Sequence, residues 1–411
     1  MDAYLRIASL DQGKSFKDRE DLNSSLIPYG RQDISEEDIA SVVAVLKSDY
    51  LTQGPKVPEF EERVTKYVGA QFAVAVNSAT SALHIACLAL GVEKGDVVWT
   101  SPITFVASAN AALYCGADVD FVDIDSRTYN MSVAALRMKL EVAQKNGKLP
   151  KVVIPVHLAG QSCEMREIHE LSKQYQFKII EDASHAIGAD YLGQKVGSCK
   201  YSDICVFSFH PVKIITTAEG GMAVTNNAEL AERMNLFRSH GITRDASKMQ
   251  GASEGPWYYQ QIELGFNYRM TELQAALGCS QMSRIEEFVQ RRQMLARQYD
   301  SHLAKSPLIL SPWQDPNSKS SYHLYVIRLK NEKSKKSHLE VFEYLRENNI
   351  GVNLHYIPVH TQPYYSKMGF LPEDFPNAMA YYQEAISLPL FSGMNDNQQS
   401  EVLKRLNEAL L

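Results

Sequence analysis

Between residues 73 and 226 the chain alternates β-rich runs with helical patterns. The β-rich runs are AVAVN, DVVWTS, VDFVDID, KVVIPVHLAG, FKIIEDAS, DICVFSFH and GGMAVTN. Several are separated by helical patterns, among them SATSALHIACLALGV, TFVASANAALYCGA and MREIHELSKQYQ. Strands joined through helices form right-handed crossovers and a mostly parallel sheet covered on both faces. The sequence therefore predicts an α/β fold whose ligands bind at the carboxyl ends of the strands.

The segments on either side of this region suggest the domain organisation. Residues 1–26 are polar and show no clear period, which is typical of a tail or an arm. Residues 226–298 are mainly helical, with an interruption around SEGPWYY, and the run from Asn267 to Tyr299 reads as one long or kinked helix. We predict a large domain over 27–298 and a smaller α+β domain over 299–411, where YHLYVIRLK reads as a strand, LEVFEYLRENNI as a helix and GVNLHYIPVHTQPYY as an extended segment.

Composition narrows the class of protein. The net charge is -6, so nothing favours nucleic acid or an anionic membrane as a partner. The first 20 residues have no apolar core typical of a secretory signal, and the most apolar stretch, 73–92, is broken by polar residues. The six cysteines are scattered and form no CxxC pair, as expected for buried thiols in a reducing compartment. These features predict a cytoplasmic protein.

The stretch SFHPVKIITTAEGG (208–221) contains one lysine, Lys213, among apolar residues and ahead of a Gly-Gly turn. A surface lysine is the simpler interpretation. A lysine desolvated by apolar neighbours, however, has a lowered pKa and becomes a usable nucleophile.

Polar groups at other expected strand ends could serve such an amine. NSATSALHIA (77–86) begins a helix, which makes it either an anion site or an ordinary N-cap. Asp182, after the apolar run FKII, is either a helix N-cap or an acid that keeps a ring nitrogen protonated, and Glu181 reads as a solvated acid. Ser208 is either a turn cap or a donor to a phosphate. Amine, acid and phosphate anchor together are the parts of a pyridoxal 5'-phosphate (PLP) site.

On these motifs the sequence resembles the nucleotide-sugar aminotransferase family (DegT/StrS type). The motifs are FSFHPVKIITTAEGG, EDASHAIGA, NSATSALH, YLTQGPKVPEFEE and GFNYRMTELQAALG, and the resemblance runs from about Pro28 to the C-terminus. It implies the aspartate aminotransferase-like fold of fold type I PLP enzymes. It also implies amino transfer from glutamate to C4 of a UDP-linked 4-keto-6-deoxy-N-acetyl hexosamine, in pseudaminic acid biosynthesis.

The resemblance also assigns roles to residues. Lys213 would bind the cofactor as an internal aldimine and move the proton during catalysis. Asp182 would pair with the pyridine nitrogen, His185 would sit near the phenolic oxygen, and Phe105 would stack on the ring. The phosphate would be held by the backbone of Ala79 and Thr80, by Ser208, and by Asn267 from the second subunit of a homodimer with shared sites.

Candidate residues for the nucleotide-sugar pocket lie in three segments. Arg31 suits a diphosphate, and the other candidates are Tyr29, Gln53, Trp257 and Tyr258, the last two being either packing or contact residues. We expect no metal site. His355 and His360 would lie on opposite faces of an extended segment and line a pocket mouth.

Several other functions compete with this interpretation. Within the family, the acceptor could be another nucleotide-linked keto sugar, with a C3 keto group or a dTDP carrier, because few contacts decide sugar selectivity. A family dehydratase is disfavoured, because those enzymes carry histidine where this chain has Lys213. A Rossmann dehydrogenase is disfavoured because no GxGxxG follows a strand. A non-catalytic protein on the same fold is a further alternative.

Overall fold

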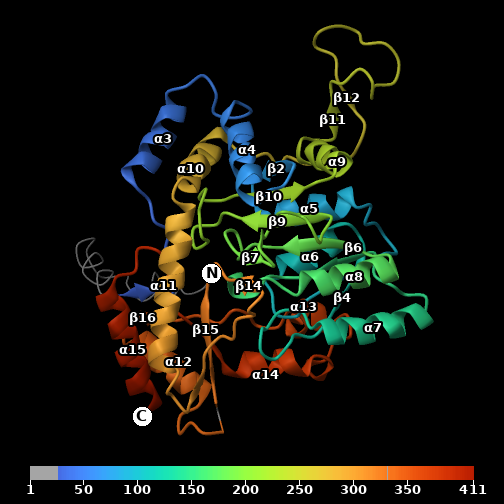
Figure 1. The fold of residues 1–411 in the computed structure, drawn as a ribbon. Coiled ribbons are helices and arrows are strands. Elements are labelled where there is room, and N and C mark those ends of the chain that lie inside the picture. The colour runs from blue at the N-terminus through green and yellow to red at the C-terminus, as the bar shows by residue number, and fades with distance from the viewer. Residues whose placement is uncertain (1–25, 331) are drawn as a thin grey trace.

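The computed structural model describes residues 26–330 and 332–411. This part of the chain forms a large α/β body around a seven-stranded sheet, with a smaller C-terminal part packed beside it (Figure 1). The predicted N-terminal arm, residues 1–26, lies outside the described residues except for Leu26. Among the described helices, none is both long enough and apolar enough to cross a bilayer.

The central sheet consists of the predicted β-rich runs. In spatial order its strands are β2 (Phe72–Val76), β10 (Gly221–Thr225), β9 (Ile204–Ser208), β6 (Lys178–Asp182), β5 (Val152–Ile154), β3 (Val97–Thr100) and β4 (Asp118–Phe121). β10 runs antiparallel to both of its neighbours, β2 and β9, while the other strands of the sheet run parallel to one another. The prediction of a mostly parallel α/β sheet is confirmed.

Both faces of this sheet are buried. Alternate residues of a strand point to opposite faces, and here they belong to different apolar clusters. Val74 and Val76 belong to one apolar cluster and Ala75 to another. The covering helices are α5 (Ala79–Ala89) and α6 (Ala107–Tyr114) in the first cluster, α4 (Lys56–Val68) and α10 (Glu272–Met282) in the second, and α7 (Val133–Lys145) and α8 (Met165–Tyr175) in a third. The strand ends are the part of the sheet that remains available to a ligand.

Helix α7 is absent from the sequence prediction. Its N-cap is Ser132, whose side chain accepts a hydrogen bond from the Ala135 N–H. Leu136, Leu140 and Ala143 are buried at helical spacing. Both signals are present in the sequence, so this helix could have been predicted.

The segment 226–298 is only partly helical. After α9 (Ala228–Arg238), the chain forms a hairpin arm, residues 242–261, whose strands are β11 (Ile242–Thr243) and β12 (Gln260–Gln261). The arm projects from the body beyond α9 (Figure 1). The predicted long helix is divided into α10 and α11 (Ile285–Leu303), which meet at Ser283 and Arg284. The predicted domain boundary at residue 298 falls inside α11.

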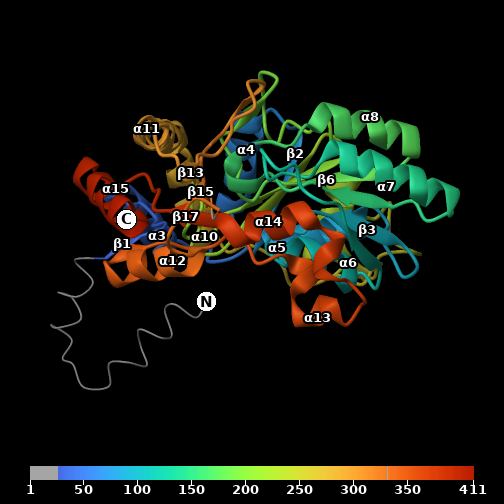
Figure 2. The same cartoon turned by 90° about the horizontal axis from the view of Figure 1, so that it is seen from below.

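The C-terminal part packs a small sheet against helices. The strands of this sheet are β13 (Ile309–Leu310), β15 (Tyr325–Leu329) and β17 (Ala385–Leu388), and the helices are α12 (His338–Glu347), α14 (Pro376–Glu384) and α15 (Asp396–Leu410). The strand predicted in YHLYVIRLK is β15. The segment predicted as extended ends in a short helix, α13 (Pro363–Ser366), so that prediction is wrong at its C-terminal end. α13 lies next to α6, where the Tyr365 hydroxyl donates to Asn110 (Figure 2).

The remaining short strands pair segments that are far apart in the sequence. β1 (Ile27–Pro28) pairs in parallel with β16 (Ile350–Gly351), so the start of the predicted large domain joins the C-terminal part. β7 (Asp190–Tyr191) pairs with β8 (Gln194–Lys195) and with β14 (Ser318–Lys319). α3 (Glu36–Leu46) packs on α10 through its buried side. The six cysteines all lie in the described residues and are free thiols.

Candidate active site

Lys213 lies in the loop that joins β9 to β10. Its backbone N–H donates to the His210 carbonyl over 2.9 Å, and the next residues, Ile214 and Ile215, are buried. Burial lowers the pKa of the Lys213 amine from 10.5 to about 8, while the charge of Asp182 acts in the opposite direction. The amine is therefore a better nucleophile near neutral pH than an exposed lysine.

Asp182 ends β6 and is only 5% exposed. Its carboxylate accepts hydrogen bonds from the Ser108 hydroxyl (2.6 Å) and from the Ser184 N–H (3.1 Å). The residues after Asp182 form turns and no helix, so Asp182 is not a helix N-cap. Because Asp182 pairs with Val206 on the parallel strand β9, Ser208 comes two residues later at the same edge of the sheet.

The start of α5 and the start of β10 form a cradle with Ser208. Ser78 caps α5, and the N–H groups of Ala79 and Thr80 belong to the first turn, where a helix offers no carbonyl partner. Gly221 pairs with Ser208, and a Cβ built on Gly221 would lie 2.4 Å from the Ala79 nitrogen. Only glycine permits this close approach, which aligns the helix start with the Ser208 hydroxyl. Such a cradle suits a phosphate.

His185 is buried next to Asp182 and held from two sides. Its Nδ1 accepts the Ala159 N–H (3.3 Å), and its Nε2 lies 3.0 Å from the Tyr356 hydroxyl. Burial, aided by the charges of Lys213 and His355, lowers the pKa of His185 well below its ordinary value. Phe105 is 59% exposed, and its ring centroid lies 6.2 Å from that of Tyr356. The exposed Phe105 ring offers a flat surface to a planar ligand.

Three side chains that contact the candidate site residues are absent from the sequence prediction. Ser108 contacts Asp182, Tyr356 contacts His185, and the His323 ring lies 4.4 Å from that of His185. His323 is 3% exposed, and its Nδ1 has no hydrogen-bond partner in the described residues. Tyr356 and His323 lie in segments that the sequence marks as aromatic, HYIPVH and YHLYVIRLK. Neither segment reveals which of its side chains points toward the site.

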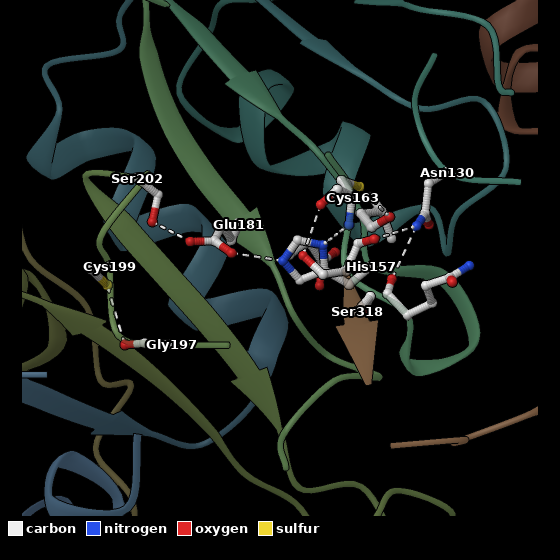
Figure 3. A network of polar contacts seen from close by, with 12 residues as sticks. Asn130, His157, Cys163, Glu181, Gly197, Cys199, Ser202 and Ser318 are labelled. Carbon is white, nitrogen blue, oxygen red and sulfur yellow. Dashed lines mark hydrogen bonds and ion pairs between the residues drawn. The ribbon is translucent and has the colours of Figure 1, made fainter. Parts of the chain in front are cut away.

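The predictions for Glu181, His355 and His360 need correction. Glu181 is 5% exposed and pairs with His157, so it is not a solvated acid (Figure 3). His355 and His360 are buried and do not line a pocket mouth. His355 bonds to Ser387 (2.8 Å), and burial together with the Lys213 charge lowers its pKa to about 3. His360 packs on aromatic rings, with its centroid 4.7 Å from that of Phe375.

The predicted sugar-pocket residues do not all lie together. Tyr29 lies near the lysine loop, because its ring centroid is 5.2 Å from that of His355 and a Cβ on Gly30 would lie 3.5 Å from Val212. Arg31 and Gln53 are exposed. Trp257, which is 70% exposed, and Tyr258 lie on the hairpin arm, away from the sheet of their own chain (Figure 1).

Asn267 is exposed where the chain returns from the hairpin arm. Its backbone pairs with Ser239 across an isolated bridge. The carbonyl of the next residue, Tyr268, accepts the N–H of Asn77 (2.8 Å), one residue before the Ser78 cap. Asn267 therefore stands near the chain that leads into the phosphate cradle, with its side chain on the surface.

The residues at this strand edge fit PLP. A lysine amine suits the aldehyde, a buried carboxylate suits the ring nitrogen, and the cradle around Gly221 suits the phosphate. The fold and the site thus define a PLP-dependent enzyme. Residues 32–407 match the DegT/DnrJ/EryC1/StrS aminotransferase family, and the chain belongs to this family.

Relatives agree with this family. The chain is 38% identical over 384 residues to the spore coat polysaccharide biosynthesis protein SpsC of Bacillus subtilis, covering 93% of this chain and 96% of SpsC. It is 39% identical over 371 residues to the UDP-4-amino-4,6-dideoxy-N-acetyl-beta-L-altrosamine transaminase of Campylobacter jejuni serotype O:2, covering 90% of this chain and 94% of that protein.

A solved structure gives the same result. Helicobacter pylori PseC, an aminotransferase involved in the biosynthesis of pseudaminic acid, superposes with a TM-score of 0.84 at 31% identity. The match covers 94% of this chain and 99% of PseC. A similar protein of Streptococcus pneumoniae, named "Putative sugar aminotransferase Spr1654", has structures in PMP and PLP forms, with TM-scores of 0.84 and 0.83 at 31% and 30% identity. The protein is a PLP-dependent sugar aminotransferase with the aspartate aminotransferase-like fold.

The lowered pKa of Lys213 leads to a pH prediction. In enzyme freed of cofactor, the rate at which Lys213 combines with added PLP should rise with pH and level off above about 8. Only the neutral amine is a nucleophile, and a lowered pKa makes it neutral at a lower pH. Stopped-flow absorbance measures the rate. The control is N-acetyl-lysine, whose rate should keep rising toward its pKa of about 10.4. A protein profile that follows this control would contradict the prediction.

Proposed function

We propose that this enzyme transfers the amino group of glutamate to C4 of a UDP-linked 4-keto-6-deoxy-N-acetyl hexosamine, a step of pseudaminic acid biosynthesis. The observation that carries this proposal is the 39% identity over 371 residues to the Campylobacter jejuni altrosamine transaminase. The name of that relative describes a UDP-linked 4-amino-4,6-dideoxy sugar. The free thiols of all six cysteines support a cytoplasmic location.

The side chains of the site have complementary roles in this proposal. When bound, PLP supplies an aldehyde that carries the amino group and a ring that withdraws electrons from the reacting carbon. The Lys213 amine would hold the cofactor and would move a proton at C4 of the sugar. Asp182 would keep a proton on the ring nitrogen, His185 would donate to the phenolic oxygen, and Phe105 would offer its face to the ring.

The phosphate and the nucleotide sugar are bound by other groups. The N–H groups of Ala79 and Thr80, the Ser208 hydroxyl and the Asn267 amide hold the phosphate. Arg31 is exposed, and its planar guanidinium suits the diphosphate of UDP, with Tyr29 and Gln53 beside the sugar. We assign Trp257 and Tyr258 to the nucleotide-sugar site of a partner subunit, because the hairpin arm carries them away from their own sheet (Figure 1).

This arrangement requires a homodimer, and an exposed apolar surface supports one. The exposed side of α3 carries Ile39, Val43 and Leu46 at helical spacing, and these residues are 48%, 38% and 57% exposed. Apolar surface of this kind marks an interaction site. A two-fold dimer would bury it and would give two equivalent shared active sites.

The shared site leads to a complementation prediction. Subunits with Lys213→Ala and subunits with Asn267→Ala are refolded together so that heterodimers form. In each heterodimer one site carries both defects and the other carries neither. Because random pairing puts about half of the subunits in heterodimers, activity should recover to about a quarter of the wild-type level. Glutamate-dependent product formation measures the recovery.

The separately refolded variants are the controls. Lys213→Ala alone should be inactive, and Asn267→Ala alone should keep roughly a tenth of the wild-type rate, since it loses one hydrogen bond to a charged group. Activity of the mixture no higher than the average of these two controls would mean that Asn267 serves the cofactor of its own subunit.

The substrate proposal is tested with candidate keto sugars. Purified enzyme is incubated with glutamate and with UDP- or dTDP-linked sugars that carry a keto group at C4 or C3, and mass spectrometry identifies the aminated product. We expect amination of the UDP-linked 4-keto sugar. Preference for a dTDP-linked or 3-keto sugar would favour another nucleotide-sugar transaminase. Amination of none of them would overturn the proposed acceptor and would point to another sugar substrate.

A further inference from the structure

A turn next to the active site is held by buried polar side chains. It comprises residues 157–163, follows β5, and is here named the His157 turn. The Nε2 of His157 lies 2.7 Å from Glu181 Oε2, and its Nδ1 accepts the Cys163 N–H over 3.1 Å (Figure 3). The other oxygen of Glu181 accepts the Ser202 hydroxyl. Neither His157 nor Glu181 has a role in the proposed chemistry.

The tautomer of His157 follows from these contacts. Burial disfavours a charged His157 ring, whereas Cys163 and Glu181 raise its pKa to about 10. The Cys163 N–H points at Nδ1, so this nitrogen accepts and carries no proton. A carboxylate only accepts hydrogen bonds, so the ring proton is on Nε2, facing Glu181. This leaves Nδ1 free to accept the Cys163 N–H, and that bond closes the turn. Without an acceptor at Glu181, the buried Nε2–H has no partner, which favours the tautomer with the proton on Nδ1, and the closing bond is lost in that tautomer.

Asn130 holds the same turn from the opposite side. Its Oδ1 accepts the Leu158 N–H over 2.9 Å, and its Nδ2 donates to the carbonyls of Gln161 (3.0 Å) and Ser162 (3.1 Å). Asn130, His157 and Glu181 are all buried. A buried polar group without a hydrogen-bond partner costs free energy. This network therefore favours the one conformation of the turn in which all of its groups are paired.

The turn directs one backbone N–H at the active site. Ala159 has a φ of 59°, in the left-handed region. Residues other than glycine rarely adopt this conformation, so the surrounding structure must hold Ala159 in it. Its N–H donates to His185 Nδ1 over 3.3 Å. His185 must then carry its proton on Nε2, which faces the Tyr356 hydroxyl at 3.0 Å.

We propose that Glu181 and His157 are positioning residues that fix the tautomer of His185 through the Ala159 N–H. The inference deepens the proposed function and rests on it for the role of His185 at the phenolic oxygen. Glu181 and His157 touch neither the substrate nor the cofactor in this proposal. They keep the His185 Nε2–H available as a donor on the side of Tyr356.

The tautomer is measured in enzyme freed of cofactor, so the test does not depend on transamination. Long-range ¹H–¹⁵N spectra report the tautomer of each of the 11 histidines, and His185→Gln identifies the signal of His185. Wild type should show His185 with its proton on Nε2. Glu181→Leu should give a mixture of tautomers, whereas Glu181→Gln, which keeps an acceptor oxygen, should preserve the wild-type signal. An unchanged His185 signal in Glu181→Leu would overturn the proposal.

The matched control is Tyr299→Phe. It removes a buried hydrogen bond of 2.9 Å to the Pro389 carbonyl in the separate apolar core of the C-terminal part, so it lowers stability without touching the turn. Its His185 signal should stay that of wild type, and a mixture of tautomers in this variant would attribute the effect to general loosening. If Glu181→Leu does not fold, the double variant Glu181→Leu/His157→Phe replaces both partners with apolar groups, which costs less than leaving one unpaired. It also removes the acceptor of the Cys163 N–H, so it should give the same mixture.

Kinetics give a second measurement in the loaded enzyme. Glu181→Leu should lower kcat roughly tenfold, about the effect of one hydrogen bond, with KM little changed. Glu181→Gln should restore most of this loss. A rise in KM with kcat intact would contradict a role at the cofactor. If the protein transaminates none of the candidate sugars but the His185 tautomer responds as expected, the proposed function fails and the structural link between Glu181 and His185 stands.

Discussion

Replacing Lys213 with alanine is expected to abolish amino transfer while leaving the fold intact. Lys213 is the lysine in the loop between β9 and β10, and its amine has a pKa lowered to about 8 by burial. Its removal takes away both the covalent attachment of the cofactor and the group that moves the proton, so the rate should fall by at least about a thousandfold. Stability should not suffer, because the variant no longer desolvates a charged amine.

Two measurements and one control variant test this expectation. Product formation from glutamate and a keto sugar gives the rate, and absorbance in the violet reports the covalent link to the cofactor, which borohydride should fix permanently in wild type. The control is Lys305→Ala, at an exposed lysine after α11, which should behave as wild type. An active Lys213→Ala variant that keeps the violet absorbance would show that another amine binds the cofactor.

The sequence predicts the sheet well because its strands are short apolar runs bounded by polar residues. FKIIED and DICVFSF become β6 and β9, and each places a polar residue at its carboxyl end. The antiparallel direction of β10 is not visible in GGMAVT, since a strand pattern is the same in both directions. The strands of the hairpin arm are not visible in the sequence at all, because two residues each are too few to give a periodic signal.

Individual side chains are harder to predict, because burial depends on partners far along the chain. Glu181 reads as solvated beside Asp182, but His157, 24 residues away, gives it a buried partner. The sequence predicts that His355 and His360 line a pocket mouth in an extended segment, but contacts to Ser387 and Phe375 bury them. Asp182 and Ser208 are easier, because the strand ends of a parallel sheet meet at one edge.

Replacing Asp182 with asparagine is expected to preserve the fold and cofactor binding but to lower the rate about a hundredfold or more. Asparagine keeps the size of the side chain and an oxygen for the Ser184 N–H. The Ser108 hydroxyl can accept from the new amide, since it also contacts the Thr104 hydroxyl at 2.7 Å. What disappears is the negative charge that holds a proton on the ring nitrogen, and loss of one preorganised electrostatic partner typically costs a factor of about 100 to 1,000.

The measurement compares kcat, cofactor affinity and melting temperature in Asp182→Asn and wild type. Asp300→Asn is the matched control, because Asp300 is a half-buried carboxylate that accepts the Tyr325 hydroxyl in a separate apolar core. It should shift the melting temperature without lowering kcat. The decisive comparison is kcat at equal cofactor occupancy, because a neutral ring nitrogen weakens withdrawal of electrons from the reacting carbon without releasing the phosphate from its cradle. Wild-type kcat in Asp182→Asn would mean that Asp182 only organises the turn at Ser184 and that another group protonates the ring.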